Sequence, residues 1–599
     1  MDPISDPVTG ARCLQTMVPM RDGVRLNTFV FLPGDGGPRF PVIVHRTPYG
    51  IAAADAHDKF DVAHAWLPNP AEPMRGSILR GWRAIVEHGY AAVYQDCRGR
   101  HGSEGEDRVY ADDAADGHDT LAWIAAQPWT NGRVGMSGSS AGATTTYAAA
   151  STRHPSLRAF FVQAGGSSIY DDVVCEGQSI EMERLWLWVA RNIPGLSASH
   201  RAAVMQRFGL STAELDAAAE RAAARYARLD AARHACPPYV GSADWMHLPL
   251  AGYPDFATWQ PFLDEIITHP APDAFRAQHN FRATIDIPGF HATSWFDIFQ
   301  TSVIAAFEDI QGRTGTQKLW VGPNEHYFIY ASNFWPRDPY FEWFGYWLKD
   351  EPTPLIDEPA VFYSPRAWAA DPAAYRPSDW RGAERWPPPG VTPRRLYLCG
   401  DGTLSEVPGG DPRFYVYDPR KPIPSYGGRN MLIDPGPLDQ RPAQALPDYG
   451  LIYRVPALDH DLAIAGNVRM TLHAQSDCPD TDFIAKLIEL KPSGEAILLM
   501  DGVVRALYRE PVVGPQPLSP DRVYRLTIDL GHICHTFPAG SRIEIDMTSS
   551  NFPRRARNTN SGNPVLAHDT EAAIRVANNT VHHAEATPSF VDLPVLPRP

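Results

Sequence analysis

One pentapeptide of the sequence has the composition of a turn that presents a serine nucleophile. Gly-Ser-Ser-Ala-Gly at residues 138–142 is the only match in the chain to the pattern G-x-S-x-G. The sequence predicts a short strand before it, from Arg133 to Met136, and an Ala- and Thr-rich helix after it, from Ala143 to Ala150. A sharp turn between them would lift Ser140 out of the chain, and small neighbours allow that turn. Ser140 is therefore our candidate nucleophile, with an ordinary Gly- and Ser-rich turn as the alternative.

A serine needs a base to take its proton and a carboxylate to orient that base. Where this serine turn is catalytic, the acid and then the histidine follow it along the chain, each after a strand. Asp297 follows a predicted strand from Ile285 to Ala292 and the short segment Thr-Ser-Trp-Phe, and His326 follows a predicted strand from Lys318 to Val321. Because open α/β sheets hold ligands at the carboxyl ends of their strands, Asp297 and His326 are the candidate acid and base.

The negative oxygen of an acyl-transfer intermediate needs hydrogen-bond donors that are fixed in place. The backbone N–H of Ala141, directly after the nucleophile, is one candidate. The loop after a predicted strand from Val42 to His45 should supply the second, and Tyr49 offers a phenolic hydroxyl there. A tyrosine that merely packs beside the turn is the alternative, and the local sequence alone favours it.

The elements around these residues change character along the chain. Strands alternate with helices up to about residue 168, which predicts a mostly parallel sheet covered on both faces, with an irregular loop over residues 51–78. Strand signals then stop, and helical patterns follow up to about residue 280. These helices are predicted over Ser179 to Ile193, Ser199 to Phe208 and Thr212 to Ala235. We interpret this block as a helical cap inserted into the sheet domain.

Beyond residue 360, Pro-rich connectors separate runs that alternate apolar and polar residues, such as Val468 to Leu472, Val523 to Leu530 and Ile543 to Met547. Alternation with period two predicts an antiparallel sandwich. The predicted domains are an α/β core at 1–168 and 281–360, a helical cap at 169–280 and a β-sandwich at 361–599.

Composition limits the partners. The 599 residues carry a net charge of −15, which argues against nucleic acid and anionic membranes. The sequence shows no signal-like amino terminus and no apolar run of membrane-spanning length. It also lacks the motifs C-x-x-C, P-loop, dinucleotide fingerprint and H-E-x-x-H. The segment His532-Ile533-Cys534-His535 could supply metal ligands, but it lies in an alternating strand pattern, which argues against a metal site. We therefore expect a cytoplasmic protein with a small-molecule ester or amide substrate, no metal and no cofactor. A homo-oligomer is compatible with this composition.

Several motifs together resemble the cocaine esterase and X-prolyl dipeptidyl-peptidase superfamily. The matching segments are Arg46-Thr47-Pro48-Tyr49, Asp96-x-Arg98-Gly99, Gly135-Met136-x-Gly138-x-Ser140, Gly289-x-x-x-x-Ser294-Trp295-Phe296-Asp297, Gly322-Pro323-x-x-His326, Tyr417-Asp418-Pro419, Asp480-Thr481-Asp482-Phe483, Ser549-Ser550-Asn551-Phe552-Pro553-Arg554 and Thr580-Val581-His582-His583. The resemblance covers nearly the whole chain. It implies an α/β-hydrolase core, a helical cap and a carboxy-terminal jelly roll. It also implies a triad of Ser140, Asp297 and His326, with the Tyr49 hydroxyl in the oxyanion hole.

Two features depart from the superfamily pattern. Asn324 stands where an aromatic residue usually precedes the catalytic histidine, which could alter the packing behind His326. The 51–78 loop looks longer than in cocaine esterase and could reshape the mouth of the site.

The sequence predicts a serine hydrolase that cleaves carboxylic esters of neutral aromatic or aliphatic acids through an acyl-enzyme. An amidase or peptidase of the same superfamily is the alternative, of the X-Pro dipeptidyl-peptidase, β-lactam acylase or α-amino-acid ester hydrolase type. A catalytically silent carbohydrate-binding protein is the alternative from another class, against which the intact set of candidate residues weighs.

The residues after Asp297 bear on the acyl group. The α-amino-acid ester hydrolases of this superfamily resemble one another in carrying acidic residues two and three positions after the catalytic Asp, where they pair with the substrate's ammonium. Phe299 and Gln300 occupy these positions here. We expect Phe299 to form an apolar wall of the acyl pocket, with packing under the cap as the alternative. Trp186 and Trp188 are further candidate substrate-binding residues, although two residues so spaced on a helix cannot both face one side.

Overall fold

The computed structural model describes residues 4–5, 10–34, 39–51, 81–232, 241–326, 339–370, 376–431, 433–510 and 513–597. The predicted loop at residues 51–78 lies outside the described residues, except for Ile51.

A large sheet forms the amino-terminal part of the molecule, with the strand order β1-β2-β3-β5-β4-β6-β7-β10-β11-β12-β13. Neighbouring strands run parallel from β5 to β12 and antiparallel at both ends. The strands are β1 (Ile4–Ser5), β2 (Arg12–Pro19), β3 (Arg25–Leu32), β4 (Phe40–Thr47), β5 (Ala91–Asp96), β6 (Thr130–Ser139), β7 (Leu157–Gln163), β10 (Gly289–Phe296), β11 (Gln317–Glu325), β12 (Val361–Tyr363) and β13 (Arg381–Ala383).

Helices cover both faces of this sheet, which explains why its central strands are buried on both faces and rich in apolar residues. On β4, Val42 and Val44 belong to one hydrophobic cluster and Ile43 to another. The first cluster packs against α2 (Asp113–Ala125), α3 (Ala141–Ala150) and α9 (Gln300–Thr314), and the second against α1 (Trp82–Glu87) and α10 (Tyr340–Lys349). A strand buried on both faces has no polar side, in agreement with the predicted α/β core.

The segment between β7 and β10 is mainly helical. It contains the π-helix η2 (Ile169–Val174), α4 (Met182–Asn192), α5 (Ala198–Phe208), α6 (Thr212–Ala231), α7 (Pro261–Ile267) and α8 (Ala274–Ala277). Two predicted boundaries were wrong. Ser179 and Ile180 form β9, which pairs with β8 (Cys175–Glu176), so the first long helix starts only at Met182. The next core strand starts at Gly289 instead of Ile285, because Ile285 caps the 3₁₀ turn Phe281–Thr284.

The carboxy-terminal part is a sandwich of two antiparallel sheets, as the jelly-roll prediction requires. One sheet contains β15 (Leu404–Ser405), β14 (Thr392–Leu398), β24 (Phe590–Val595), β18 (Leu462–Ser476), β23 (Ala577–Val581), β16 (Arg413–Tyr417) and β21 (Tyr524–Phe537). The other contains β17 (Leu451–Arg454), β22 (Arg542–Thr548), β19 (Asp482–Leu490) and β20 (Ala496–Arg505). Because β12 and β13 pair with the large sheet, that sheet continues beyond the predicted boundary at residue 360. The other domain boundaries remain predictions.

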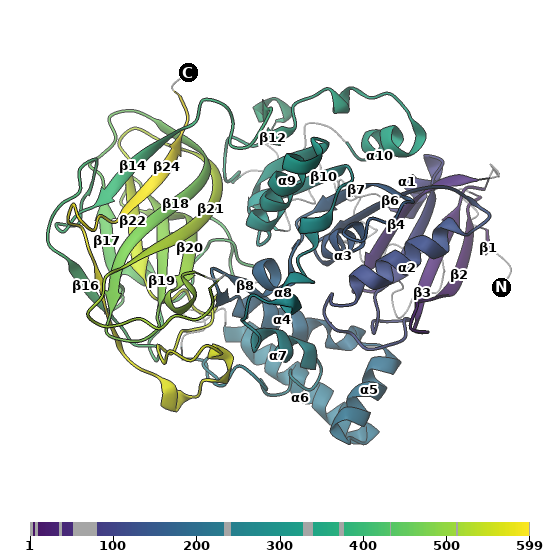
Figure 1. Ribbon diagram of the computed structural model, residues 1–599, viewed down its shortest axis with the longest axis horizontal. Coiled ribbons are helices and arrows are strands. Elements are labelled where there is room, and N and C mark those ends of the chain that lie inside the picture. Colours follow the sequence, from purple (N-terminus) through teal and green to yellow (C-terminus); the bar gives the residue numbers. More distant parts are fainter. Residues whose placement is uncertain are drawn as a thin grey trace.

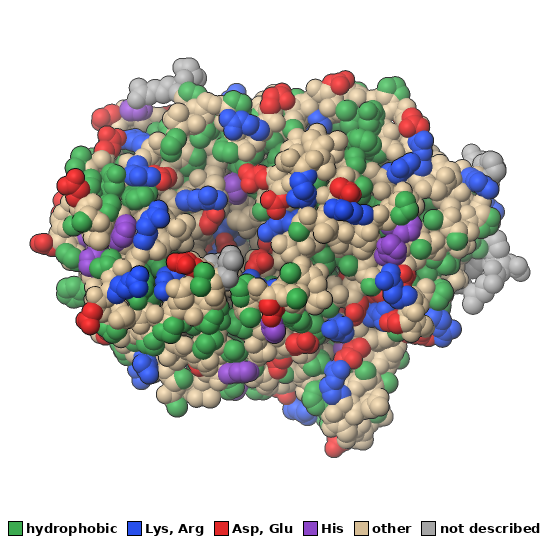
Figure 2. Space-filling model, viewed as in Figure 1, with side chains coloured by type: hydrophobic (Ala, Val, Ile, Leu, Met, Phe, Trp, Pro, Cys, Tyr) green, Lys and Arg blue, Asp and Glu red, His purple; other side chains and the backbone are tan. Residues whose placement is uncertain are grey.

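Figure 1 shows the sandwich on one side and the large sheet on the other, with the cap helices α4, α6 and α7 beneath and between them. Basic and acidic side chains are interspersed on the face drawn in Figure 2, without a large area of one sign. Within the described ranges, no helix is both long enough and apolar enough to cross a membrane.

Candidate active site

Ser140 lies in a sharp turn between β6, which ends at Ser139, and α3, which begins at Ala141. Its backbone has φ 53° and ψ −121°, a conformation that L residues rarely adopt and that persists only when the surroundings enforce it. Position 138, two residues before Ser140, requires glycine, because a Cβ there would lie only 2.1 Å from the carbonyl oxygen of Gly142. The crowded turn projects the Ser140 side chain away from the backbone, as the strand–turn–helix pattern predicts.

The structure brings the three predicted residues of the triad together. His326, which follows β11, has its Nε2 at 3.0 Å from Ser140 Oγ and its Nδ1 at 2.7 Å from Asp297 Oδ1. Asp297 follows β10, and β10 and β11 are parallel neighbours, so the two residues leave the same edge of the sheet. In the neutral histidine tautomer that donates from Nδ1 to Asp297, Nε2 has no proton and can accept the one from Ser140.

Asp297 is fully buried and held by three donors. Besides His326, the backbone N–H of Phe299 donates to Oδ1 at 3.2 Å, and the hydroxyl of Thr293 donates to Oδ2 at 2.7 Å. Hydrogen bonds to both oxygens offset the cost of burying the carboxylate and fix its orientation. Asp297 can therefore orient His326 without rotating itself.

Of the two predicted oxyanion donors, Ala141 directly follows the nucleophile, and Tyr49 is joined to the pocket residue Trp188. The Ala141 N–H is in the first turn of α3, where a helix offers its N–H groups no acceptor. Tyr49 follows β4, and its hydroxyl oxygen accepts the indole N–H of Trp188 at 3.1 Å. Asp96, from one of the resemblance motifs, anchors this loop because its Oδ1 accepts the N–H of Ile51 at 3.0 Å.

Ser140 opens into a pocket of about 470 Å³, counted with its mouth. The lining is mostly apolar, as in many small-molecule sites. The lining residues come from the loop before α2, the nucleophile turn, the cap, the loop after Asp297 and the carboxy-terminal part: Val109, Tyr110, Ser140, Ala141, Val173, Arg184, Leu185, Trp188, Val189, Leu263, Ile298, Phe299 and Met431.

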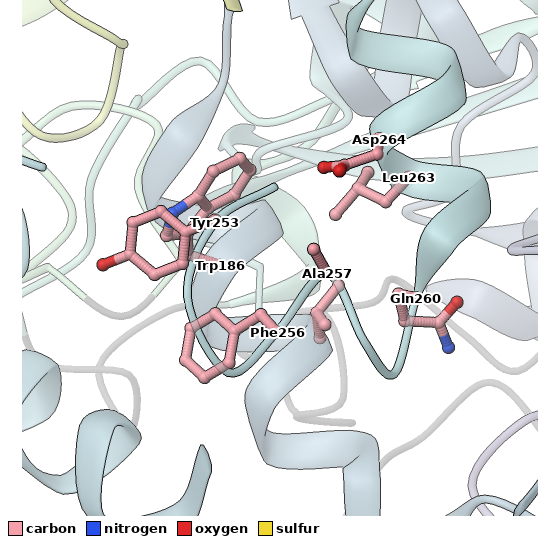
Figure 3. A pocket seen from close by; sticks show the side chains of 8 residues that line it. Trp186, Tyr253, Phe256, Ala257, Gln260, Leu263 and Asp264 are labelled. Atoms are coloured by element: carbon pink, nitrogen blue, oxygen red, sulfur yellow. The ribbon is translucent and has the colours of Figure 1, made fainter. Parts of the chain in front are cut away.

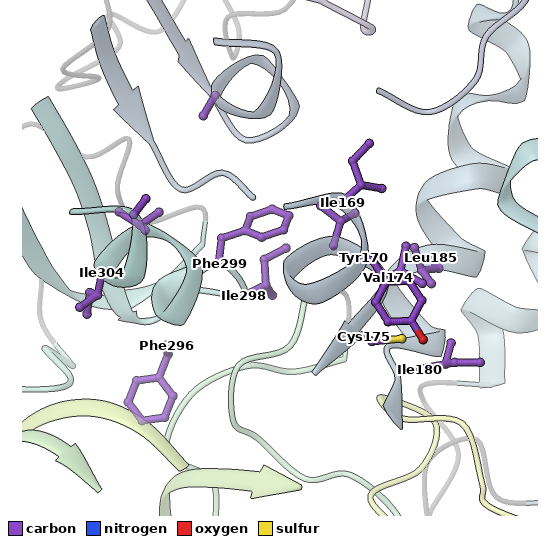
Figure 4. Packing of buried hydrophobic residues seen from close by; sticks show 14 of the residues in the cluster. Ile169, Tyr170, Val174, Cys175, Ile180, Leu185, Phe296, Ile298, Phe299 and Ile304 are labelled. Carbon is purple, nitrogen blue, oxygen red and sulfur yellow. The ribbon is translucent and has the colours of Figure 1, made fainter. Parts of the chain in front are cut away.

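Phe299 lies in the wall of this pocket, and its ring centroid is 5.9 Å from that of His326. Figure 4 shows Ile298 and Phe299 beside the π-helix that carries Ile169, Tyr170 and Val174. Gln300 is different: its amide donates to the carbonyl oxygens of Trp295 and His532, so it fixes the carboxy-terminal part instead of facing the pocket.

The two candidate tryptophans, Trp186 and Trp188, lie in different environments. Trp188 lines the Ser140 pocket, whereas Trp186 is buried against Tyr253 at a ring distance of 5.1 Å and lines a second, smaller hollow (Figure 3). The prediction that Trp186 contacts substrate therefore needs correction. Residues two apart on a helix point about 200° apart, which follows from 3.6 residues per turn.

Asn324 replaces an aromatic residue without disturbing His326. It adopts φ 70°, which asparagine tolerates better than bulky residues, and it is buried. Its amide donates to the carbonyl oxygen of Ala369 at 3.0 Å and accepts the N–H of Ala369 at 2.6 Å. Asn324 thus ties the end of β11 to the segment after β12.

Sequence reasoning missed Tyr110, Arg184 and Met431 as pocket residues. Arg184 precedes Trp188 by one helical turn, so helical periodicity alone could have placed both on one face. Val109 and Tyr110 both have positive φ, a strained pair that no local motif announces. Met431 comes from the carboxy-terminal part, and nothing in its own segment points to the site.

The described residues contain no group of three or more His, Cys, Asp or Glu that could hold a metal. In the segment 532–535, His532 accepts the indole N–H of Trp386 at 2.9 Å and His535 pairs with Glu489 at 2.9 Å. These histidines have structural partners.

The fold and the serine turn define a serine hydrolase of the α/β-hydrolase class. The chain belongs to the X-Pro dipeptidyl-peptidase (S15) family, whose model matches residues 22–328; the model of the X-Pro dipeptidyl-peptidase C-terminal non-catalytic domain matches residues 357–592. This confirms the resemblance read from the motifs.

Relatives agree over almost the full length. Cocaine esterase of Rhodococcus sp. (strain MB1 Bresler) is 31% identical over 97% of this chain and 98% of its own. The crystal structure of an aminopeptidase from a marine sediment archaeon, Thaumarchaeota archaeon, superimposes with a TM-score of 0.73 at 22% identity, covering 99% of this chain and 98% of that one. A solved α-amino acid ester hydrolase gives a TM-score of 0.72 at 22% identity over the same shares. The two structures support the fold.

Proposed function

We propose that this serine hydrolase is a carboxylesterase that acts through an acyl-enzyme on Ser140. The observation that carries the proposal is the continuous hydrogen-bonded line from Ser140 through His326 to Asp297, with distances of 3.0 and 2.7 Å, at the edge of a mostly apolar pocket. The 31% identity to a cocaine esterase supports ester cleavage as the activity.

In the proposed acylation step, His326 Nε2 takes the Ser140 proton while Oγ attacks the ester carbonyl carbon. The positive imidazolium that forms is stabilised by the buried Asp297 carboxylate. Negative charge collects on the former carbonyl oxygen, where the Ala141 N–H and the Tyr49 hydroxyl would donate. Since Tyr49 accepts the Trp188 N–H through its oxygen, its own hydroxyl proton remains available for this bond.

The intermediate then expels the alcohol, which receives the proton from His326 Nε2. A water molecule repeats the sequence on the acyl-enzyme: His326 takes its proton, hydroxide adds to the carbonyl carbon, and the proton returns to Ser140 as the acid leaves. The chain's own side chains supply every proton transfer in this scheme.

The pocket supports esters of acids without an α-amino group. An enzyme that binds a free amino terminus must compensate the ammonium that loses its water. No Asp or Glu is among the described residues that line the pocket, and Phe299 occupies the position where the α-amino-acid ester hydrolases resemble one another in carrying an acid. A small-molecule ester, a cytoplasmic location and independence from nucleic acid and membranes make up the rest of this proposal. The net charge of −15 supports the independence from nucleic acid and anionic membranes.

The test is turnover of p-nitrophenyl butyrate by the wild type and by Ser140→Ala, together with labelling by a fluorophosphonate. We expect the wild type to turn over and to be labelled, and Ser140→Ala to lose about 10⁴-fold or more of the rate and all of the label. Ser139→Ala is the matched control and should keep both. Labelling that persists in Ser140→Ala would show that Ser140 is not the nucleophile. Faster cleavage of an X-Pro anilide than of any ester would show that the enzyme is a peptidase and not an esterase.

A further inference from the structure

One charged side chain lines the otherwise apolar pocket around Ser140. Among the described lining residues, Arg184 alone carries a charge. It comes from the first turn of α4, and its side chain is buried. Arginine keeps its proton in proteins, so this wall of the pocket is positive even though burial lowers its pKa.

The hydrogen-bond partners of Arg184 are backbone carbonyl groups, although the carboxylates of Glu181 and Glu176 stabilise its charge from farther away. Its Nε donates to the carbonyl oxygen of Val173 at 2.9 Å, one terminal nitrogen to that of Ile298 at 3.1 Å, and the other to that of Asp172 at 2.7 Å. A guanidinium has five N–H groups, so these three bonds leave two of them without an acceptor among the described residues. Within the described part of the chain, no carboxylate forms an ion pair with Arg184.

Two neighbouring arginines, Arg554 and Arg555, differ from Arg184 because each forms ion pairs with carboxylates. Arg555 contacts Glu181 at 2.6 Å and Glu176 at 2.7 Å, and Arg554 contacts Asp501 at 2.6 Å. These carboxylates are already shared among other arginines and do not reach Arg184 as ion-pair partners. The positive charge of Arg184 is therefore less compensated than that of its neighbours.

Arg184 is also close to where an acyl group would lie. Its guanidinium carbon is 5.3 Å from the centroid of the Phe299 ring, and that ring is 5.9 Å from the ring of His326. A charge on the substrate near the scissile carbonyl would meet Arg184 across apolar surroundings, where charges interact more strongly than in water.

We propose that Arg184 sets the charge preference of the acyl pocket: it admits acyl groups that carry a carboxylate and excludes those that carry an α-ammonium. The substrate class is then the half-ester of a dicarboxylic acid, whose free carboxylate would accept the unused guanidinium N–H groups. This inference rests on the esterase activity proposed above and adds the charge of the acid to it.

The test compares three methyl esters that differ only at the α-carbon: phenylacetate, phenylglycine and the monoester of phenylmalonic acid. We expect wild-type kcat/KM for the carboxylate and neutral esters to exceed that for the ammonium ester by about tenfold or more. In Arg184→Met, the ratio of the carboxylate to the ammonium ester should fall by at least about tenfold, and Arg184→Lys should retain most of it. Arg191→Met, an exposed arginine on the same helix, should leave the ratio unchanged.

Ratios of kcat/KM cancel the amount of folded enzyme, so partial misfolding of Arg184→Met cannot imitate the result. If Arg184 only holds the three carbonyl groups in place, kcat/KM of Arg184→Met will fall equally for all three esters. The ratios between the esters will then be unchanged, and the proposal is overturned. A wild type that prefers the phenylglycine ester would overturn it as well. Failure of the wild type on every ester, p-nitrophenyl butyrate included, would instead reject the esterase activity.

Discussion

Trp188 donates its indole N–H to the hydroxyl oxygen of Tyr49 at 3.1 Å, which joins the first long cap helix to the loop after β4. The contact fixes the orientation of a hydroxyl that is otherwise on an exposed loop residue. It also connects a pocket wall to a proposed oxyanion donor.

This contact predicts the effect of removing the Tyr49 hydroxyl. Tyr49→Phe should lower kcat by roughly 10²- to 10³-fold with little change in KM, because the donor acts on charge that develops only in the transition state. Trp188→Phe should cost less, since it removes only the bond that orients Tyr49. Steady-state kinetics on p-nitrophenyl butyrate measure both, with pre-steady-state acylation showing that chemistry limits the rate. An unchanged kcat in Tyr49→Phe would leave this tyrosine with a packing role.

The wall at Phe299 predicts a change of acyl preference. Phe299→Asp places a carboxylate in the pocket, where it can compensate a substrate ammonium. We expect the ratio of kcat/KM for phenylglycine over phenylacetate methyl ester to rise by at least about tenfold, some 1.4 kcal/mol. Phe299→Leu is the uncharged control and should leave the preference for phenylacetate in place. A rise of equal size in the control would show that space, and not charge, decides the preference.

The nucleophile turn predicts a contrast between two glycine substitutions. Gly138→Ala would place its Cβ 2.1 Å from the backbone oxygen of Gly142, so the turn must distort. A methyl group on Gly312, inside α9, would meet no described atom within 4 Å, and alanine is the better helix former by about 1 kcal/mol. We expect Gly138→Ala to lose esterase activity and Gly312→Ala to keep it with an equal or higher unfolding midpoint in urea. Full activity in Gly138→Ala would contradict the crowded turn.

A buried histidine predicts how stability responds to acid. His291 lies between the Tyr147 hydroxyl at 2.9 Å and the Gln317 side chain at 3.0 Å, and burial lowers its pKa to about 4. Because the unfolded chain binds this proton near pH 6.5, the stability from neutral His291 is complete above pH 6.5 and is lost as the pH falls toward 4. One pKa unit corresponds to about 1.4 kcal/mol, so this group alone can remove about 3 kcal/mol.

Urea unfolding at pH 7.5 and pH 4.5 tests this expectation. His291→Gln should be less stable than the wild type at pH 7.5, because its packing is poorer, but should lose less stability on acidification. His568→Gln, at an exposed position, is the control and should follow the wild type. An equal acid loss in His291→Gln and the wild type would assign the pH dependence to other groups.

Sequence reasoning reached the parts of this protein that local pattern determines. The apolar strands, the serine turn and the order Ser140, Asp297, His326 follow from spacing and turn chemistry, so the fold class and the three triad positions were predictable. Strand ends were less so, because Ile285 is apolar like a strand residue yet caps a 3₁₀ turn. The helical period predicted that Trp186 and Trp188 face different sides, but it did not say which of them lines the pocket.

The rest of the pocket depends on contacts between distant segments. Arg184 looks from the sequence like an ordinary helix charge, and only the fold shows its side chain against Phe299 instead of solvent. Tyr110 adopts a backbone conformation that surrounding structure imposes on it. Periodicity can place Arg184 and Trp188 on one helix face, but it does not say what that face packs against, since this is decided when separate elements pack together.

Met431 gives the pocket a wall from the carboxy-terminal part, beyond the last residue of the triad in chain order. During synthesis, the serine turn, Asp297 and His326 leave the ribosome before this wall exists. The nascent α/β core therefore emerges with its reactive line of residues but without a closed acyl site. The wall at Met431 is completed only when the second half of the chain has folded onto the first.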